Sequence, residues 1–221
     1  LSLSGPTGLP QTYFLVNARR YVFDDYLYGE RRFNPLDTNG LANPSQWLGS
    51  PNGDRKSVAM SYTREWSGLA KITNRSLSGI EISYQALFNL LDGRNMNNAF
   101  AYRYNPDAKS KQKTVSLVHG IDWTHSLSPN SFYNISLRQN YFDYKDWVFE
   151  DFFDRRYDYA GASRGLQDYE YGAIVAGVDF TRFRQKTNAF VAKASMTSQV
   201  TREHQIKVGG EFQISQVQFG T

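Results

Sequence analysis

The stretch IEISYQALFNL, residues 80–90, decides the fold. Apolar side chains occupy every second position, and the positions between them are polar except for Leu87. Successive side chains of a strand point to opposite faces of a sheet, so this alternation predicts a β-strand with one apolar and one polar face. The predicted apolar face carries Ile80, Ile82, Tyr84, Ala86, Phe88 and Leu90.

The same pattern recurs along the chain. Further segments alternate in this way or are enriched in the Tyr, Phe, Val and Ile that strands favour, although the first two alternate less regularly. The predicted strands are residues 12–24, 65–74, 80–91, 113–127, 131–142, 187–199 and 204–216. We therefore expect an all-β protein whose strands form an antiparallel up-and-down meander.

The connections between the predicted strands alternate strictly in length. Residues 75–79, 128–130 and 200–203 form tight turns, whereas residues 25–64, 92–112 and 143–186 form long loops. In a meander this places every tight turn at one end of the sheet and every long loop at the other. Transmembrane barrels have this asymmetry, with long loops on the extracellular side, whereas compact soluble domains rarely carry such loops.

Strand length and aromatic content favour the same class. Most predicted strands have 10–15 residues, and about 9–11 tilted residues cross a bilayer, whereas soluble strands average about 5–6. Aromatic residues make up 15% of the chain and gather near strand ends, as at Trp123, Phe132 and Tyr141. The mean hydropathy of −0.56 is compatible with a barrel, because only every second residue of a strand must face lipid.

Composition argues against several other functions. The chain has no Cys, which excludes disulfides, thiolate zinc sites and cysteine nucleophiles. Its net charge of +4 arises from 25 basic and 21 acidic residues that are well mixed, so we expect no nucleic-acid partner. His119 and His125 fall on one face of a strand but about 20 Å apart, too far to share a metal. We predict neither an enzyme nor a bound cofactor.

Several stretches share the pattern of one family. They are Leu3-Ser4-Gly5-Pro6 with Tyr13-Phe14-Leu15 and Arg19-Arg20-Tyr21, Gly29-Glu30-Arg31-Arg32-Phe33-Asn34-Pro35, Tyr104-Asn105-Pro106-Asp107, Trp123-Thr124-His125-Ser126-Leu127-Ser128-Pro129 with Ser131-Phe132-Tyr133, and Thr197-Ser198-Gln199-Val200-Thr201 with His204-Gln205-Ile206-Lys207-Val208-Gly209-Gly210-Glu211-Phe212. Spread over most of the chain, they resemble strands, turns and outer loops of the TonB-dependent receptors of Bacteroidetes-like bacteria.

This resemblance implies a large barrel, of about 22 strands with a plugged lumen, in the bacterial outer membrane. Such a protein imports a nutrient (a glycan, a peptide or a metal chelate) with energy passed on by the inner-membrane TonB complex. The implied partners are outer-membrane lipid, the remaining barrel and plug of the same receptor, the TonB complex and a surface lipoprotein lid. The sequence itself contains neither the plug nor a TonB-contacting segment.

Residues 1–221 are thus expected to form part of a barrel, with about seven strands. An odd number of strands with open edges cannot stand alone in lipid. We therefore expect the remaining strands and the plug to come from sequence outside this chain. On this expectation the predicted strands 12–24 and 204–216 either pair with such strands or remain edges. The chain also begins at Leu1 without a signal-peptide pattern, as the interior of a longer polypeptide would.

The loop 143–186 is the richest in chemistry, because it mixes carboxylates with aromatic side chains. Aromatic rings stack on sugar faces, while carboxylates accept hydrogen bonds from sugar hydroxyls. The candidate ligand-binding residues are Tyr144, Trp147, Asp151, Asp154 and Tyr157. Such carboxylates also suit Ca²⁺, although no EF-hand spacing is present. Alternatively, the aromatic side chains pack on one another and Asp154 forms an ion pair with Arg155 or Arg156.

The polar faces of the strands are expected to point to the lumen or the plug of the barrel. The candidates for these lumen-facing positions are Arg138, Lys193, Lys207 and Glu211. A soluble β-sandwich that binds carbohydrate is the alternative interpretation. It would bury the apolar faces in a core about 10 Å thick, whereas a barrel exposes them to lipid. Solubility without detergent would distinguish the two.

Overall fold

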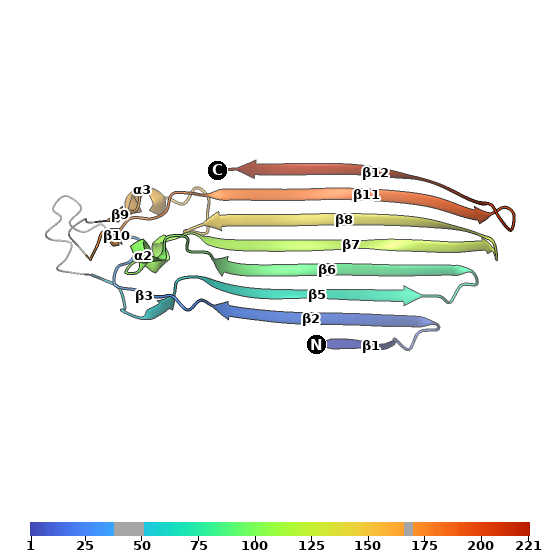
Figure 1. Ribbon diagram of the computed structural model, residues 1–221, viewed down its shortest axis with the longest axis horizontal. Coiled ribbons are helices and arrows are strands. Elements are labelled where there is room, and N and C mark those ends of the chain that lie inside the picture. Colours follow the sequence, from blue (N-terminus) through green and yellow to red (C-terminus); the bar gives the residue numbers. More distant parts are fainter. Residues whose placement is uncertain (38–50, 166–169) are drawn as a thin grey trace.

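The computed structural model describes residues 1–37, 51–165 and 170–221, and its main feature is one antiparallel sheet (Figure 1). The sheet has eight strands in the order β1-β2-β5-β6-β7-β8-β11-β12, so neighbours follow one another along the chain. The strands are β1 (Ser2–Pro6), β2 (Thr12–Asp24), β5 (Tyr62–Asn74), β6 (Ile80–Arg94), β7 (Lys111–Ser128), β8 (Ser131–Trp147), β11 (Phe183–Gln199) and β12 (Gln205–Gly220). The predicted all-β class and antiparallel meander are confirmed.

All seven predicted strands form, and the sheet has one further strand beyond the expected number of about seven. The additional strand, β1, has only five residues, among them Gly5 and Pro6, and the alternation of Leu1 and Leu3 with Ser2 and Ser4 is too short to predict a strand. It pairs with β2, with Leu3 opposite Val16, so the expectation that β2 would be an edge or pair outside the chain was wrong. At the other side of the sheet, β12 has a neighbour only in β11 among the described strands.

Tight turns and long loops lie at opposite ends of the sheet, as predicted (Figure 1). The long loops carry short elements: β3 (Tyr28–Glu30) pairs with β4 (Ser57–Ala59), and β9 (Arg164–Gly165) pairs with β10 (Ile174–Ala176). They also contain α2 (Ala99–Tyr102), α3 (Arg156–Ala160) and a 3₁₀ turn at Pro106–Ala108. Residues 38–50 and 166–169 of these loops lie outside the described residues. None of the described helices is long and apolar enough to cross a membrane.

The strand register gives the sheet two chemically distinct faces. One row across the strands from β5 to β12 consists of Ile72, Tyr84, Ile121, Leu137, Ala192 and Phe212. The adjacent row, which points to the other side, consists of Lys71, Gln85, Gly120, Arg138, Val191 and Gln213. We call the first side the apolar face and the second side the polar face.

The apolar face is uncovered over the described part of the chain. Leu137 is 53% exposed and Phe212 is 65% exposed, although both lie near the middle of their strands. The other described sheets have only two strands each and belong to the long loops. Both clusters of buried hydrophobic residues also lie in those loops. The hydrophobic core therefore sits at one end of the sheet and not on its face.

Candidate functional site: the loop cap and the two faces of the sheet

The long loops join into a single unit, which we call the loop cap: the described residues of 25–61, 95–110 and 148–182. Its main core draws on every one of these loops and contains Met60, Met96, Tyr102, Ala108, Phe149, Tyr157, Ala160 and Val178. A smaller cluster adds Phe33, Val175 and Ala176. Because each loop packs on the others, the cap is one body and not a set of separate hairpin tips.

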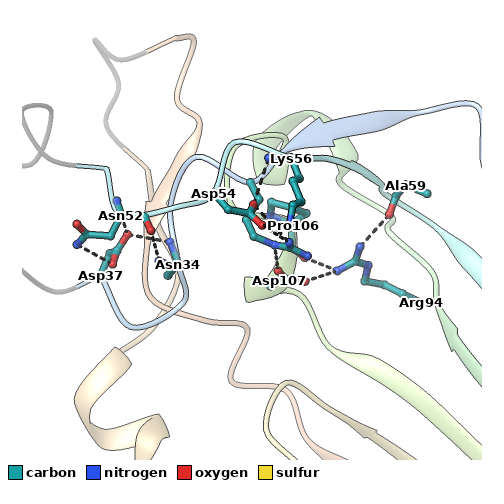
Figure 2. A network of polar contacts seen from close by, with 10 residues as sticks. Asn34, Asp37, Asn52, Asp54, Lys56, Ala59, Arg94, Pro106 and Asp107 are labelled. Atoms are coloured by element: carbon teal, nitrogen blue, oxygen red, sulfur yellow. Dashed lines mark hydrogen bonds and ion pairs between the residues drawn. The ribbon is translucent and has the colours of Figure 1, made fainter.

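Arg94, at the end of β6, ties the first two loops to the sheet (Figure 2). Its side chain is 1% exposed and forms an ion pair with Asp107 at 3.3 Å. The guanidinium also donates hydrogen bonds to three backbone carbonyl groups, those of Ala59 (2.8 Å), Met60 (3.1 Å) and Pro106 (2.7 Å). Asp107 accepts a second charged bond, from Arg31 Nε at 2.6 Å. A buried cation with this many acceptors can remain charged without water.

The third loop attaches to the second through polar contacts. The hydroxyl groups of Tyr102 and Ser163 lie 2.9 Å apart. Lys109 forms an ion pair with Asp179, whose backbone N–H donates to the carbonyl oxygen of Ala108 at 2.8 Å. These bonds fix the third loop over the same core.

Asp179 makes the stability of the cap depend on pH. Burial opposes its ionisation, but hydrogen bonds from Lys109 and Thr181 outweigh that effect and lower the pKa of Asp179. A carboxyl group with a lowered folded pKa stabilises the fold above its unfolded pKa of about 3.9, and this contribution is lost as pH falls through the folded value. We therefore expect wild-type protein to melt at a higher temperature than Asp179→Asn at pH 6. By near-UV circular dichroism, the difference should shrink below about pH 4. A difference that persists unchanged to low pH would contradict this role.

Two predicted ligand-binding residues lie in a strand and not in a loop. β8 continues to Trp147, so both Tyr144 and Trp147 belong to it, which corrects the predicted loop boundary. Tyr144 pairs with Thr114 on the polar face, whereas Trp147 pairs with Lys111 on the apolar side. The structure therefore does not bring the two rings together.

Tyr157, in α3, is a core residue. Its side chain is 2% exposed, and its hydroxyl accepts hydrogen bonds from the backbone N–H groups of Val148 at 3.0 Å and Phe149 at 3.2 Å. The ring of Phe149 lies edge-on to it, with 4.8 Å between ring centroids. Its ring holds the cap together and offers no surface on which a sugar could stack, which corrects the prediction from the sequence.

The two predicted acidic residues stabilise the turn that contains them. An oxygen of Asp151 accepts a hydrogen bond from the backbone N–H of Phe153 at 3.0 Å. Asp154 forms an ion pair with Arg156 at 2.6 Å, and the side-chain hydrogen bond from Arg156 lowers the pKa of Asp154. The predicted Asp154–Arg156 pair is thereby confirmed. Whether either carboxylate also binds a ligand stays a prediction.

The cap carries other aromatic side chains that stand free in solvent. Tyr26 is 87% exposed and Tyr171 is 88% exposed, and Phe153 and Tyr159 are also largely exposed. Tyr26 lies outside every stretch of sequence that predicted a ligand contact. The only local sign is the preceding Asp25, whose carboxylate accepts a hydrogen bond from the Tyr26 backbone N–H at 2.7 Å. These rings, and not Tyr157, are the surfaces on which a ligand could stack.

The four residues predicted to face a lumen lie together on the polar face. Arg138 forms an ion pair with Asp122 at 2.6 Å, and Lys193 forms one with Glu211 at 3.6 Å. Lys207 lies on the same face, opposite Thr197. Glycine at position 120 leaves room for the Arg138 side chain. A Cβ atom at this position would lie 2.2 Å from the carbonyl oxygen of Leu137 and 3.1 Å from the Arg138 side chain.

A row of polar groups crosses the apolar face over four strands. The Tyr84 hydroxyl lies 3.3 Å from His119 Nδ1, and His119 Nε2 lies 3.0 Å from Gln139 Oε1. Gln139 Nε2 in turn donates to Asn188 Oδ1 at 2.9 Å. Because Gln139 Oε1 can only accept, His119 Nε2 is the donor in that contact. The row gives each of the four side chains a polar partner within an otherwise apolar surface.

Within the described residues, no three His, Asp or Glu side chains gather closely enough to hold a metal ion. Comparisons of the chain with family models, with curated proteins and with solved structures found no match.

Proposed function

We propose that this chain is part of an outer-membrane β-barrel that imports a nutrient, as its resemblance to the TonB-dependent receptors implies. The observation that carries the proposal is the uncovered apolar face, with large side chains such as Leu137 and Phe212 more than half exposed in mid-strand. A contiguous apolar surface of this extent is rare in soluble proteins and is what a lipid-facing surface requires.

The dimensions of the apolar face support this proposal. On β8 the face runs from Tyr133 through Ile135, Leu137 and Gln139 to Tyr141, with Gln139 held in the polar row described above. Eight residue steps span about 27 Å along a strand, or about 20 Å along the membrane normal at a tilt of about 40°. Membrane barrels have an apolar band about 25 Å tall with aromatic residues at both rims. Tyr133 and Tyr141 occupy those rims.

The two ends of the sheet suit the two sides of the outer membrane. Tight turns face the periplasm in such barrels, and long loops face the outside. The loop cap then lies on the cell surface, where its exposed aromatic rings beside carboxylates favour a glycan over the other nutrient classes. The polar face, with the Arg138–Asp122 and Lys193–Glu211 pairs, lines the lumen against the plug. The remaining barrel, the plug, the TonB complex and a surface lipoprotein are the proposed partners.

Deletion of the encoding gene in its host tests this function. Mutant and complemented cells are grown on limiting amounts of single glycans, peptides or metal chelates. We expect the mutant to lose growth on one nutrient class, most directly a glycan, and a protonophore to abolish uptake of that nutrient in complemented cells. Unchanged growth on every nutrient, or uptake that ignores the protonophore, would contradict an energised importer.

A further inference from the structure

Cations on the apolar face of the sheet are confined to one end. The Lys and Arg residues that the described strands place on this side all lie near the long loops: Arg20, Arg64, Arg94, Lys111, Lys113, Lys145, Arg184 and Lys186. Toward the tight turns the same face carries residues such as Ile82, Ile135 and Met196. The polar face shows no such division, since Lys193 and Lys207 lie nearer its tight-turn end.

Three of these cations lie directly opposite one another. Lys113 pairs in register with Lys145, and Lys145 pairs in register with Arg184. Like charges directly across neighbouring strands destabilise a sheet. Of the described carboxylates, only Asp143 lies within ion-pair distance of Lys145 (4.0 Å) or Arg184 (3.3 Å). One carboxylate shared by two cations leaves positive charge that a bound anion would neutralise.

A groove opens beside these side chains. Its volume is about 350 Å³, and it is lined by Lys145, Trp147, Glu150, Asp151, Phe152, Phe153 and Arg184. Two carboxylates also line it: Glu150 forms an ion pair with Lys113 at 3.7 Å, and Asp151 accepts a hydrogen bond from the backbone N–H of Phe153 but keeps its negative charge. A second hollow of about 280 Å³ adjoins Arg184 and Lys186 on the next strands. Trp147 and Asp151, predicted as ligand contacts, thus border a groove on the apolar side of the sheet.

The aromatic neighbours of these cations are those of a membrane interface. Lys145 Nζ lies 5.2 Å from the ring centroid of Trp147, and Lys186 Nζ lies 5.6 Å from that of Tyr141. Aromatic rings and long basic side chains gather at the level of lipid headgroups. Directly toward the sheet centre, the same face continues with Phe190 and Leu137, on which acyl chains could rest.

We propose that this groove and the adjoining hollow bind the phosphate of an anionic lipid headgroup in the leaflet beside the long loops, with Lys145 and Arg184 as contacts in the groove and Lys186 as a contact in the hollow. The inference rests on the proposed membrane location and adds a ligand that is distinct from the imported nutrient. Lys186 lies in register with Asp143, so four cations (Lys113, Lys145, Arg184 and Lys186) face three carboxylates (Asp143, Glu150 and Asp151), and the excess positive charge selects an anion. The apolar rows that adjoin the groove select a lipid over free phosphate. Each basic residue near a membrane surface contributes about 1 kcal/mol to anionic lipid binding, or about fivefold in affinity.

Native mass spectrometry of the full-length protein in a neutral detergent tests the site. The probes are phosphatidylglycerol, phosphatidylcholine and inorganic phosphate. We expect the Lys145→Gln/Arg184→Gln variant to lose affinity for phosphatidylglycerol about 30-fold, with phosphatidylcholine binding unchanged. The matched control is Lys193→Gln/Lys207→Gln, which removes the same charge from the polar face and should leave both affinities within about twofold.

Three results would overturn the proposal: equal phosphatidylglycerol affinity in Lys145→Gln/Arg184→Gln and wild type, an equal loss in the control, or inorganic phosphate binding as tightly as the lipid. If the double variant fails to fold, Lys186→Gln replaces it, with an expected loss of about fivefold, and an unchanged affinity overturns the site. A wild-type protein that needs no detergent would instead contradict the membrane location. The two failures are therefore distinguishable.

Discussion

In the proposed barrel, replacing Phe212 by Arg is expected to destabilise the protein in a bilayer by about 2–4 kcal/mol, the cost of a basic residue near the bilayer midplane on the lipid side. The same replacement at Gln213, the next residue of β12, should cost about 1 kcal/mol or less, because a polar face tolerates charge. Phe212 is in register with Ala192 on the apolar face, and Gln213 is in register with Val191 on the polar face. The two substitutions therefore lie at nearly the same position along the strand but on opposite faces of the sheet.

Reversible unfolding by guanidinium in lipid vesicles, followed by Trp fluorescence, measures both free energies. Glutamine at position 212 serves as a control for loss of the Phe ring without added charge. Equal costs for Phe212→Arg and Gln213→Arg, or a larger cost at Gln213, would contradict the assignment of the two faces.

Replacing Arg94 by Met should destabilise the loop cap by about 3 kcal/mol. Removing one member of a buried charge pair costs about 3–5 kcal/mol, because its partner and other acceptors are left without a donor. In the variant, the carbonyl oxygens of Ala59 and Pro106 lose the hydrogen bonds that Arg94 donates to them. Asp107 keeps its hydrogen bond from Arg31, so we expect the lower end of that range.

Limited proteolysis in detergent measures this effect, since cleavage within the cap tracks the population of the locally open form. Arg64→Met is the matched control: its guanidinium pairs with Asp24 at the surface, where an ion pair is worth about 1 kcal/mol or less. We expect cleavage in the cap to accelerate about 100-fold in Arg94→Met and only a few fold in the control. Equal cleavage rates in the two variants would show that Arg94 does not hold the loops together.

The alternation of apolar and polar residues was sufficient to predict those strands that have one apolar and one polar face. It predicted β6 from its first residue, whereas β2, which alternates less regularly, was predicted with its full bounds from its content of Tyr, Phe and Val. β1 was missed because Gly5 and Pro6 interrupt a strand that is only five residues long. The end of β8 was missed because its extension to Trp147 depends on pairing with Lys111 at the start of β7, a contact between residues 36 positions apart that local pattern does not encode.

The site was less accessible to prediction because its residues meet only through tertiary packing. Tyr157 lies among acidic residues in the sequence and was therefore predicted to contact a ligand. In the structure its ring points into the core of the cap, where its hydroxyl accepts hydrogen bonds from two backbone N–H groups. Arg94 carried no distinguishing sequence pattern, since its acceptors come from two separate loops. The row of Lys113, Lys145 and Arg184 likewise becomes visible only once the register of three strands is known.

Spin-label accessibility along β8 tests most directly whether the apolar face contacts lipid. The chain contains no Cys, so single-cysteine variants at residues 134–137 can each carry one nitroxide. In phosphatidylcholine vesicles we expect labels at Ile135 and Leu137 to collide with oxygen dissolved in lipid, and labels at Asn134 and Ser136 to collide with a water-soluble nickel chelate. The predicted result is an alternation of period two, with the two reagents out of phase. An oxygen profile without alternation, or with maxima at Asn134 and Ser136, would contradict the membrane barrel.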